Sequence, residues 1–518
     1  MQLDQEVRVR FAPSPTGPLH IGGVRTALYN YLFAKKHNGT FILRIEDTDQ
    51  KRFVPGAEAY IIESLEWLGL TPEEGPVQGG DYGPYRQSER SDLYQKYAEK
   101  LLEEGFAYIA FDTEEELNEI RKSYEERNSA FKYDSSVRMD LNNSLRLSEE
   151  EVNSRIEAGE PYVIRMRIPE NEKVVFSDAV RDEVTFDTNE LDDKVIMKAD
   201  GLPTYHLANV VDDYYMKISH VIRGEEWISS TGHHVLLYRM LGWKDHVPQF
   251  VHLPLILKPE KGGKLSKRDG LKMDMPIVPL RWYDEAQKVE FLGFREEGFL
   301  PEATLNFLAL LGWAPGIDRE IYNMEELTNA FLLSQISQSG ARFDIQKARW
   351  FNQQYLIKSD VDQLMKYIEK WFPEIYGLGE PEYMKEILKM YVERIHVIPE
   401  IRSQIDHFFK ELPEFYDQKQ IRRRYKNENE NIYQELFDLI RTQKSFDENH
   451  LKDAVNDFVA ENSLKFGMIL PVLRLAVAGN LQGPDLFKMM EVLGREKVER
   501  RLDYAITYFA ELNAKKDE

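Results

Sequence analysis

Hydrophobic residues at the start of the chain follow first a strand pattern and then a helix pattern. Residues 7–12 alternate and then become apolar, as a buried strand does, and a proline-rich segment follows them. Apolar side chains recur at helical spacing over residues 24–32, and Asn38 with Gly39 is a natural stop because both tolerate the left-handed conformation. Residues 41–45 have the pattern of a second buried strand. This strand, loop, helix and strand unit predicts the opening of a doubly wound, Rossmann-type α/β domain.

Ligands of such a domain bind at the carboxyl ends of its strands. Glu46, Asp47 and Asp49 come directly after the second predicted strand. We therefore expect these three acidic side chains at the ligand-facing edge of the sheet.

The rest of the pattern divides the chain into further regions. A helical segment over residues 91–104 ends near Gly105, and strand-like and charged helical segments then mix up to residue 191, which predicts an inserted α+β domain. A strand-like run from Val195 and a helical run from Tyr205 return to the first domain, and the chain is almost wholly helical in period from Pro301. The predicted regions are the two halves of the Rossmann-type domain (1–105 and 192–245), the inserted domain (106–191), a segment with a basic loop (246–330) and an all-α region (331–518).

Composition indicates a large globular protein. The chain has 518 residues, of which 42% are hydrophobic, and a prior of about 150 residues per domain gives three to four domains. No apolar stretch approaches the roughly 18 residues of a membrane helix, and the first ten residues lack the basic region and apolar core of a signal peptide. We therefore expect a soluble, cytoplasmic protein. The absence of cysteine excludes disulfides and thiolate metal sites.

The charge argues against a general nucleic-acid binder. The formal net charge is -22, whereas sequence-independent binding to nucleic acid depends on Lys and Arg that neutralise phosphates. Any RNA must therefore contact a local basic surface. Two basic segments are candidates, Lys261 to Lys272 and Arg422 to Lys426, although each alone is more often a solvated charged face.

The first candidate site lies between the first predicted strand and helix. Residues 10–17 read RFAPSPTG, and His20-Ile21-Gly22-Gly23 follows at the start of the helix. Glycine lets the backbone approach a nucleotide closely, and a helix N-terminus favours the negative charge of phosphate. An imidazole at this place can donate to a phosphate oxygen. Taken alone, the same residues are more often those of a proline-rich turn with a capping histidine.

The second candidate site is the basic segment Lys264-Leu265-Ser266-Lys267-Arg268, which glycines flank. A mobile loop that carries lysine suits a reaction in which a pyrophosphate leaving group gathers charge. A basic loop by itself is usually only solvated. The occurrence of both motifs in this order, with an α/β domain to hold them, favours the functional interpretation.

The two motifs resemble the signatures of class I aminoacyl-tRNA synthetases, which are usually written HIGH and KMSKS. Gly23 stands where the second histidine is common, and Arg268 stands where serine is common. Four segments resemble the glutamyl-tRNA synthetase family of bacterial type in particular, and the likeness covers nearly the whole chain. These segments are residues 10–17 (RFAPSPTG), 44–49 (RIEDTD), 203–213 (PTYHLANVVDD) and 221–227 (VIRGEEW).

The resemblance implies a glutamate–tRNA ligase reaction. ATP would activate glutamate to glutamyl-adenylate, and the glutamyl group would pass to the 3' end of tRNA(Glu) with release of AMP and diphosphate. The implied catalytic residues are His20, Lys264 and Lys267. The implied ATP-binding residues are His20, Gly22, Gly23, Ser266, Lys267 and Arg268. The implied glutamate-binding residues are Arg10, Ala12, Ser14, Glu46, Tyr205, Asn209 and Arg223.

These assignments fit the chemistry of glutamate. Arg10 and Arg223 match the family positions that bind the side-chain carboxylate, which an arginine fork pairs with bidentately. Glu46 with Tyr205 matches the position that accepts from the α-ammonium. Singly, each residue also has a structural interpretation, such as an edge-strand arginine at position 10 or a core tyrosine at position 205.

The resemblance also implies cofactors and partners. Mg²⁺ would enter with ATP. Some relatives hold zinc in the inserted domain, but the family's cysteine-containing segment stands here as Ala107 to Thr113 and a later cysteine position is Val137, so we expect no zinc. By family analogy the inserted domain binds the tRNA acceptor end, residues 246–330 contact the stem and residues 331–518 bind the anticodon. The partners would be tRNA(Glu), L-glutamate and ATP, with no membrane, and the protein would be a monomer.

Other functions fit the sequence less well. A shorter paralogue that charges a modified base on another tRNA lacks the C-terminal helical region, and glutaminyl-tRNA synthetase is expected to lack an arginine at position 223. The long helical region also disfavours a small nucleotidylyltransferase, and the intact Lys267 loop disfavours an inactive RNA-binding relative. Whether the enzyme also charges tRNA(Gln) stays open. Arg349 and the run from Arg422 are candidates for anticodon reading by charge alone.

Overall fold

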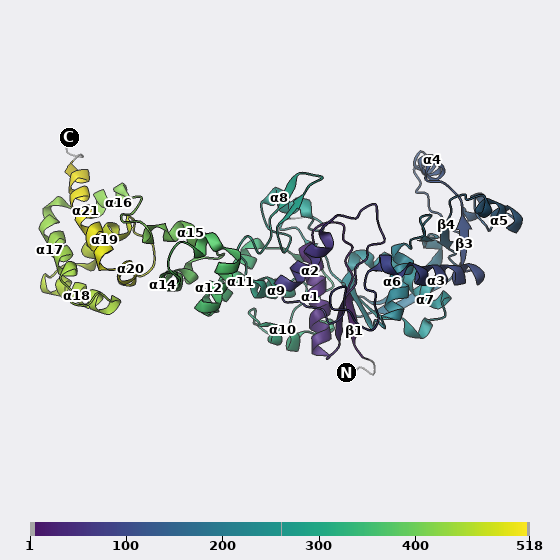
Figure 1. The fold of residues 1–518 in the computed structure, drawn as a ribbon, viewed down its shortest axis with the longest axis horizontal. Helices are drawn as coiled ribbons and strands as arrows, with labels where there is room; N and C mark the ends of the chain where they lie inside the picture. Colours follow the sequence, from purple (N-terminus) through teal and green to yellow (C-terminus); the bar gives the residue numbers. More distant parts are fainter. Residues whose placement is uncertain (1–5, 261, 515–518) are drawn as a thin grey trace. The chain divides into compact units, whose positions relative to one another are not determined.

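The computed structural model describes residues 6–260 and 262–514. Two parts of the segments discussed above lie outside the described residues. They are residues 1–5, at the start of the segment without signal-peptide features, and Lys261, at the start of the first basic segment. The chain divides into two compact units, which are described separately (Figure 1). The first comprises Met1–Glu296 with Pro301–Ala348, and the second comprises Glu297–Leu300 with Arg349–Glu518.

The regular elements have the following bounds. The strands are β1 (Arg8–Phe11), β2 (Thr40–Leu43), β3 (Ala107–Ala110), β4 (Val163–Met166), β5 (Lys173–Asp178), β6 (Asp182–Asp187), β7 (Val195–Met197), β8 (His220–Gly224), β9 (Gln249–Leu253), β10 (Ile256–Leu257), β11 (Trp282–Asp284), β12 (Val289–Phe291) and β13 (Ala341–Arg342). Helices up to residue 330 are α1 (Ile21–Lys36), α2 (Ala57–Trp67), α3 (Ser91–Glu103), α4 (Glu114–Glu125), α5 (Glu149–Glu157), α6 (Tyr205–Tyr215), α7 (Ile228–Met240), α8 (Lys267–Met273), α9 (Pro301–Ala309) and α10 (Met324–Ala330). The later helices are α11 (Ile345–Lys358), α12 (Val361–Trp371), α13 (Pro373–Tyr376), α14 (Pro381–Tyr391), α15 (Glu400–Ile405), α16 (Gln418–Arg424), α17 (Glu430–Arg441), α18 (Glu448–Glu461), α19 (Phe466–Ala478), α20 (Leu486–Leu493) and α21 (Arg495–Ala514).

A largely parallel sheet forms the centre of the first unit. β1 pairs in parallel with β2, and a four-stranded sheet has the order β6-β5-β9-β8, in which β5, β9 and β8 are parallel. The backbone N–H of Ser219, just before β8, donates to the carbonyl of Arg8 at 2.9 Å and joins the two sheets. The predicted strand, loop, helix and strand unit is therefore confirmed as β1, α1 and β2. Its predicted stop also holds, since Asn38 has a φ of 52° and a Cβ on Gly39 would lie 2.2 Å from the Val7 carbonyl oxygen.

The strands between residues 106 and 204 pair differently from the expectation. β3, β4 and β7 form an antiparallel sheet, so the run from Val195 joins the inserted region instead of returning to the first domain. β5 and β6, which we grouped with the inserted domain, instead pair with β9 in the central sheet. Alternating strands look alike in sequence, and long-range pairing decides which sheet each one joins. The domain boundaries themselves stay predictions.

Ordinary packing holds the inserted region together. Tyr108, Leu117, Tyr133 and Leu141 form a buried apolar cluster in it. The buried carboxylate of Asp193 accepts from the Tyr108 hydroxyl at 2.7 Å and from the backbone N–H of Ile168 at 3.0 Å.

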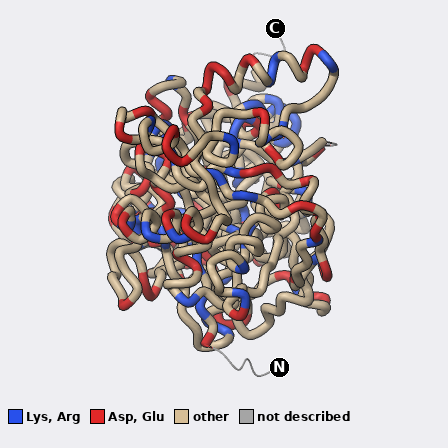
Figure 2. The backbone as a smooth tube through the Cα atoms, turned by 90° about the vertical axis from the view of Figure 1, so that its right-hand side faces the viewer, with Lys and Arg blue, Asp and Glu red and all other residues tan. Residues whose placement is uncertain are grey.

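The second unit is helical. Every regular element among its described residues is an α- or 3₁₀-helix, and α19, α17 and α16 all pack against α21. The all-α prediction from residue 331 has one exception, β13, a two-residue strand that pairs with β10 in the first unit. Within residues 6–260 and 262–514, none of the helices combines the length and apolarity that a membrane crossing requires. Basic and acidic segments are interspersed along the chain (Figure 2).

Candidate functional site

A cavity of about 1460 Å³ opens in the first unit, where β1, β2 and β8 end. It brings together most of the side chains that the sequence predicted. The predicted residues that line it are Arg10, Ala12, Ser14, His20, Gly22, Gly23, Glu46, Tyr205, Asn209, Arg223 and Lys264. Ser266, Lys267 and Arg268 are not among the lining residues and lie at the start of α8.

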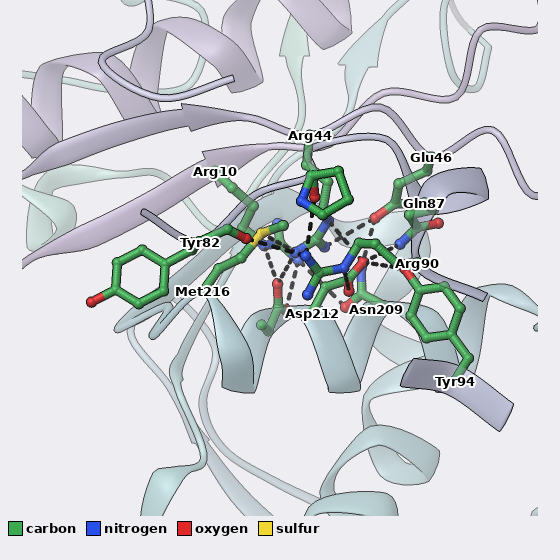
Figure 3. Close-up of polar contacts among 12 residues, drawn as sticks. Arg10, Arg44, Glu46, Tyr82, Gln87, Arg90, Tyr94, Asn209, Asp212 and Met216 are labelled. Atoms are coloured by element: carbon green, nitrogen blue, oxygen red, sulfur yellow. Dashed lines mark hydrogen bonds and ion pairs between the residues drawn. The ribbon is translucent and has the colours of Figure 1, made fainter. Parts of the chain in front are cut away.

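A buried ion network shares Arg10 and Glu46 with the lining of this cavity, and Figure 3 shows its polar contacts. Arg10 at the end of β1 donates from Nε and Nη2 to the two oxygens of Asp213 on α6, at 3.0 and 3.1 Å. Arg44, after β2, donates to Asp213 at 2.7 Å and to Glu46 at 3.0 Å. Burial opposes the charge on Asp213, but Arg10 and Arg44 outweigh it and hold the pKa of this carboxyl below its usual range.

A second set of contacts holds the same helix, α6, through Asp212. Asp212, the neighbour of Asp213 on α6, accepts from Arg90 at 2.7 Å, from Gln87 at 2.9 Å and from the Tyr94 hydroxyl at 2.8 Å. Figure 3 shows Arg10, Arg44 and Arg90 directed at the acidic side chains of this region. Three arginines therefore face the three carboxylates of Glu46, Asp212 and Asp213, and the network is balanced in charge.

Arg223 is a further cation of the site, and it does not belong to this charge-balanced network. It lies buried at the end of β8, and its nitrogens donate to neutral groups only: the Tyr205 hydroxyl at 2.6 Å, Thr231 Oγ1 at 2.8 Å, His252 Nε2 at 3.2 Å and the Trp227 carbonyl at 3.3 Å. Among the described residues no carboxylate forms an ion pair with it. Burial lowers the pKa of its guanidinium. A buried arginine without a counter-ion favours a ligand that brings a carboxylate.

Glu46 offers the opposite charge to the same cavity. Its Oε1 accepts from Arg44 at 3.0 Å and from the amide of Asn209 at 3.1 Å. Oε2 accepts no hydrogen bond from a described residue. Burial raises the pKa of Glu46, while Arg44 and Arg10 act against that rise. A ligand ammonium beside Oε2 would favour the ionised carboxylate.

His20 caps the N-terminus of α1, as a single-residue interpretation of the sequence also allowed. Its Nδ1 accepts from the backbone N–H of Gly22 at 3.0 Å, so the neutral ring carries its proton on Nε2. Nε2 is buried and has no partner among the described residues. Burial, together with Lys267 and Lys264, lowers the pKa of His20 to about 3. The ring is therefore a neutral donor that faces the cavity at a helix N-terminus.

The two lysines of the basic segment after β10 differ in their contacts. Lys264 is paired with Glu226 at 2.5 Å, whereas Lys267 forms no ion pair with a described residue, and burial lowers its pKa. Its Nζ lies 3.6 Å from the place where a Cβ on Gly17 would stand, so it reaches the loop of the first motif. Ser266 directly precedes α8, and its backbone N–H and hydroxyl donate to the Asp269 carboxylate at 2.9 and 2.5 Å. Arg268 is exposed.

Some residues of the site were not found by sequence reasoning. Arg44, Asp212 and Asp213 lie inside quoted motifs, but no pattern indicated that they would neutralise one another. Thr231 and His252 lie outside those motifs and contact Arg223 only through the fold. The chain shows no group of three or more His, Asp or Glu side chains arranged for a metal within residues 6–260 and 262–514.

Comparison with protein families gives two matches. A family described as tRNA synthetases class I (E and Q), catalytic domain, matches residues 6–350. A family described as anticodon binding domain matches residues 362–506.

Comparison with single proteins gives full-length matches. The glutamate–tRNA ligases of Amoebophilus asiaticus and Flavobacterium johnsoniae are each 50% identical to this chain, which they match over 97% and 98% of its length and 98% and 100% of theirs. A crystal structure of a glutamate tRNA ligase from Elizabethkingia meningosepticum in complex with its amino acid has a TM-score of 0.92 and 46% identity, over 97% of this chain and 99% of that one. The likeness thus extends over nearly the whole of both chains.

Proposed function

The chain belongs to the class I tRNA synthetases for glutamate and glutamine, and from that membership we infer that it is a glutamate–tRNA ligase. It joins glutamate to tRNA in two steps, with ATP as a substrate. The α-carboxylate of glutamate attacks the α-phosphate of ATP, which gives glutamyl-adenylate and diphosphate. The terminal ribose hydroxyl of the tRNA then takes the glutamyl group and releases AMP.

One observation carries the assignment of glutamate to the cavity. Arg223 is a buried cation that no carboxylate of the described chain neutralises, whereas Arg10 and Arg44 are already paired with Asp213. The side-chain carboxylate of glutamate supplies the missing charge, and the neutral amide of glutamine does not. We assign the α-ammonium of the same molecule to Glu46 Oε2 and the Tyr205 ring. Ala12, Ser14 and Asn209 line the same cavity.

The phosphate chemistry falls to the two motifs. The Nε2–H of His20 donates a hydrogen bond to an ATP phosphate oxygen, and the ring stays neutral. The glycines after it let the backbone come close to the nucleotide. Lys267 stabilises the charge that gathers on the diphosphate as it leaves. Lys264 joins it when its pairing with Glu226 is exchanged for phosphate. Ser266 and Arg268 complete the ATP-binding set. ATP enters as its Mg²⁺ complex, so magnesium is part of the substrate.

Arg223→Ala tests the glutamate assignment. The change removes the only unpaired cation proposed to face the substrate side chain, so the glutamate KM should rise by roughly tenfold to a hundredfold while the ATP KM changes little. Arg223→Lys keeps the charge but loses the planar guanidinium. Its glutamate KM should therefore lie between those of the native protein and Arg223→Ala. A normal glutamate KM in the folded alanine variant would show that the side chain binds elsewhere.

The tRNA specificity is the second part of the proposal. We assign the helical second unit to the anticodon, since residues 362–506 match an anticodon binding domain. Charging of purified tRNA(Glu) and tRNA(Gln) decides whether the enzyme serves one tRNA or both. The cytoplasmic location and the monomeric state expected from the sequence stay predictions.

A further inference from the structure

Three neighbouring strands of the central sheet carry a buried chain of hydrogen bonds that ends on Arg223. The sheet order places β5, β9 and β8 side by side, and Asp178, His252 and Arg223 lie on them in turn. His252 Nδ1 lies 2.6 Å from Asp178 Oδ2, and Arg223 Nε lies 3.2 Å from His252 Nε2. The side chains of Asp178 and His252 are 0% exposed. We call these three residues the buried triad.

The partners on both sides fix the tautomer of His252. A guanidinium is a donor only, so the imidazole Nε2 that faces Arg223 must accept. The ring proton is then on Nδ1, where it donates to the carboxylate of Asp178. Thr231 agrees with this assignment. Its hydroxyl accepts from Arg223 Nη2 at 2.8 Å and can donate its own proton to His252 Nε2 at 3.2 Å.

Asp178 is itself held firmly. Its Oδ1 accepts from the backbone N–H groups of Val180 and Arg181, both at 2.9 Å, and Oδ2 also accepts from the backbone N–H of His252 at 3.2 Å. Burial acts to raise the pKa of Asp178, but the hydrogen bond from the His252 side chain, with the backbone N–H groups of Val180 and Arg181, holds it below its usual range. Burial lowers the pKa of His252. The charged groups around the imidazole are Asp178, Arg223 and Arg181. A second proton on the ring would point an N–H at the guanidinium.

We propose that Asp178 and His252 are positioning residues that hold Arg223 in the orientation that selects glutamate over glutamine. The proposal rests on the proposed function, in which Arg223 binds the side-chain carboxylate. His252, held by Asp178, fixes the guanidinium at its Nε, and Tyr205 and Thr231 fix it at Nη1 and Nη2. The guanidinium is thereby oriented before the substrate arrives. An arginine that is aimed in advance loses less conformational freedom on binding than a free one.

Asp178→Asn tests the role of the tautomer. The two backbone N–H groups at Val180 and Arg181 keep the amide oxygen, so the amide NH₂ faces His252 Nδ1 and the ring proton moves to Nε2. An N–H then points at the Arg223 Nε–H. We expect the glutamate KM in tRNA charging to rise roughly tenfold or more, with a smaller change in kcat and an unchanged ATP KM. The preference for glutamate over glutamine should fall in parallel.

A pair of His252 variants tests the acceptor itself. His252→Phe keeps a ring beside Phe250 but has no acceptor, whereas His252→Gln can present an amide oxygen near the Nε2 position. The glutamine variant should recover most of the glutamate affinity that the phenylalanine variant loses. His220→Phe, at the other end of β8, is the matched control and should leave the glutamate KM unchanged. ¹⁵N shifts of His252 in the folded protein should report a proton on Nδ1 in the native chain and on Nε2 in Asp178→Asn.

The outcomes separate this proposal from the proposed function. If Arg223→Ala raises the glutamate KM while folded Asp178→Asn and His252→Phe leave it unchanged, the positioning role is overturned and the function stands. If Arg223→Ala also leaves it unchanged, the side-chain contact itself fails. Should Asp178→Asn not fold, the comparison of His252→Gln with His252→Phe decides, because equal glutamate KM values in both would overturn the proposal.

Discussion

Lys267 is a cation of the basic segment that no described carboxylate pairs with. It forms no ion pair with a described residue and lies beside the loop that contains Gly17. Lys267→Ala should therefore slow glutamyl-adenylate formation by about a hundredfold, which corresponds to roughly 3 kcal/mol of transition-state stabilisation, and weaken glutamate binding far less. Pyrophosphate exchange with tRNA present measures the first quantity, and the glutamate KM measures the second. Lys264→Ala should cost less, because Lys264 begins paired with Glu226. An unchanged turnover in Lys267→Ala would contradict the assignment of Lys267 to the departing diphosphate.

His20 should stay neutral throughout the working pH range. Burial, together with Lys267 and Lys264, lowers the pKa of His20 in the folded protein to about 3, whereas an unperturbed histidine has a pKa of 6.5. Since the unfolded chain binds the proton more readily, the contribution of His20 to stability is fully present above the unfolded pKa and is lost as the pH falls toward the folded one. His20→Asn should remove this part of the pH dependence of unfolding. An NMR titration of the ring that showed a midpoint near 6.5 in the folded protein would contradict the neutral donor.

The sequence predicted the residues of the site better than their partners. Arg223 and Glu46 belong to motifs whose chemistry demands a cation and an anion, so a pattern could identify them. The pairing of Arg10 with Asp213, by contrast, depends on α6 packing under β1, and no local signal distinguishes a buried aspartate from an exposed one on a helix. His252 could not be found for the same reason, because only the register of β8 and β9 brings it opposite Arg223.

At the scale of elements, local patterns located helices well and sheet membership poorly. The predicted helices near residues 24–32, 91–104 and from 205 correspond to α1, α3 and α6, because their apolar spacing is a local property. β5 and β7 were assigned to the wrong sheets, because an alternating strand does not specify its neighbour. The site depends on that neighbour choice, since Asp178 reaches His252 only when β5 pairs with β9.

Arg501 of α21 provides a test of how the helical unit is held together. Among the described residues its buried guanidinium has no acidic hydrogen-bond partner. It donates to the backbone carbonyls of Glu411, Val477, His407 and Lys410, which lie at helix ends and turns. Burial lowers its pKa to about 10. Arg501→Met should lower the free energy of unfolding of this unit by about 3 kcal/mol or more, because several buried carbonyls lose their donor at once. Chemical denaturation measures the change.

The neighbouring arginine is the matched control for that measurement. Arg500 is exposed and pairs with Glu411 and Glu496 at the surface. Arg500→Met should change the free energy of unfolding by less than about 1 kcal/mol. Equal effects of the two substitutions would show that the carbonyl contacts of Arg501 contribute little.

The whole molecule combines a unit that holds the chemistry with a unit assigned to the anticodon. All the cavity-lining residues belong to the first unit, and the anticodon-domain match begins at residue 362. A chain that ends at Ala348 should therefore keep its glutamate and ATP sites. It should lose most of its affinity and selectivity for full-length tRNA(Glu), while it charges an acceptor-stem minihelix about as well as the intact chain does. Loss of phosphate contacts should also flatten the salt dependence of binding, by a slope of about 0.7 for each contact to a single strand.

The shortened chain needs two checks before its activity is compared. The first unit also includes Pro301–Ala348, whereas Glu297–Leu300 groups with the second unit, so the cut exposes a surface around those four residues. Circular dichroism and ATP binding should first show that the shortened chain is folded. Charging of tRNA(Glu), tRNA(Gln) and the minihelix by both proteins then gives the selectivity. If the folded, shortened chain charges full-length tRNA(Glu) as well and as selectively as the intact protein, the helical unit does not read the anticodon, and the division of labour between the two units is wrong.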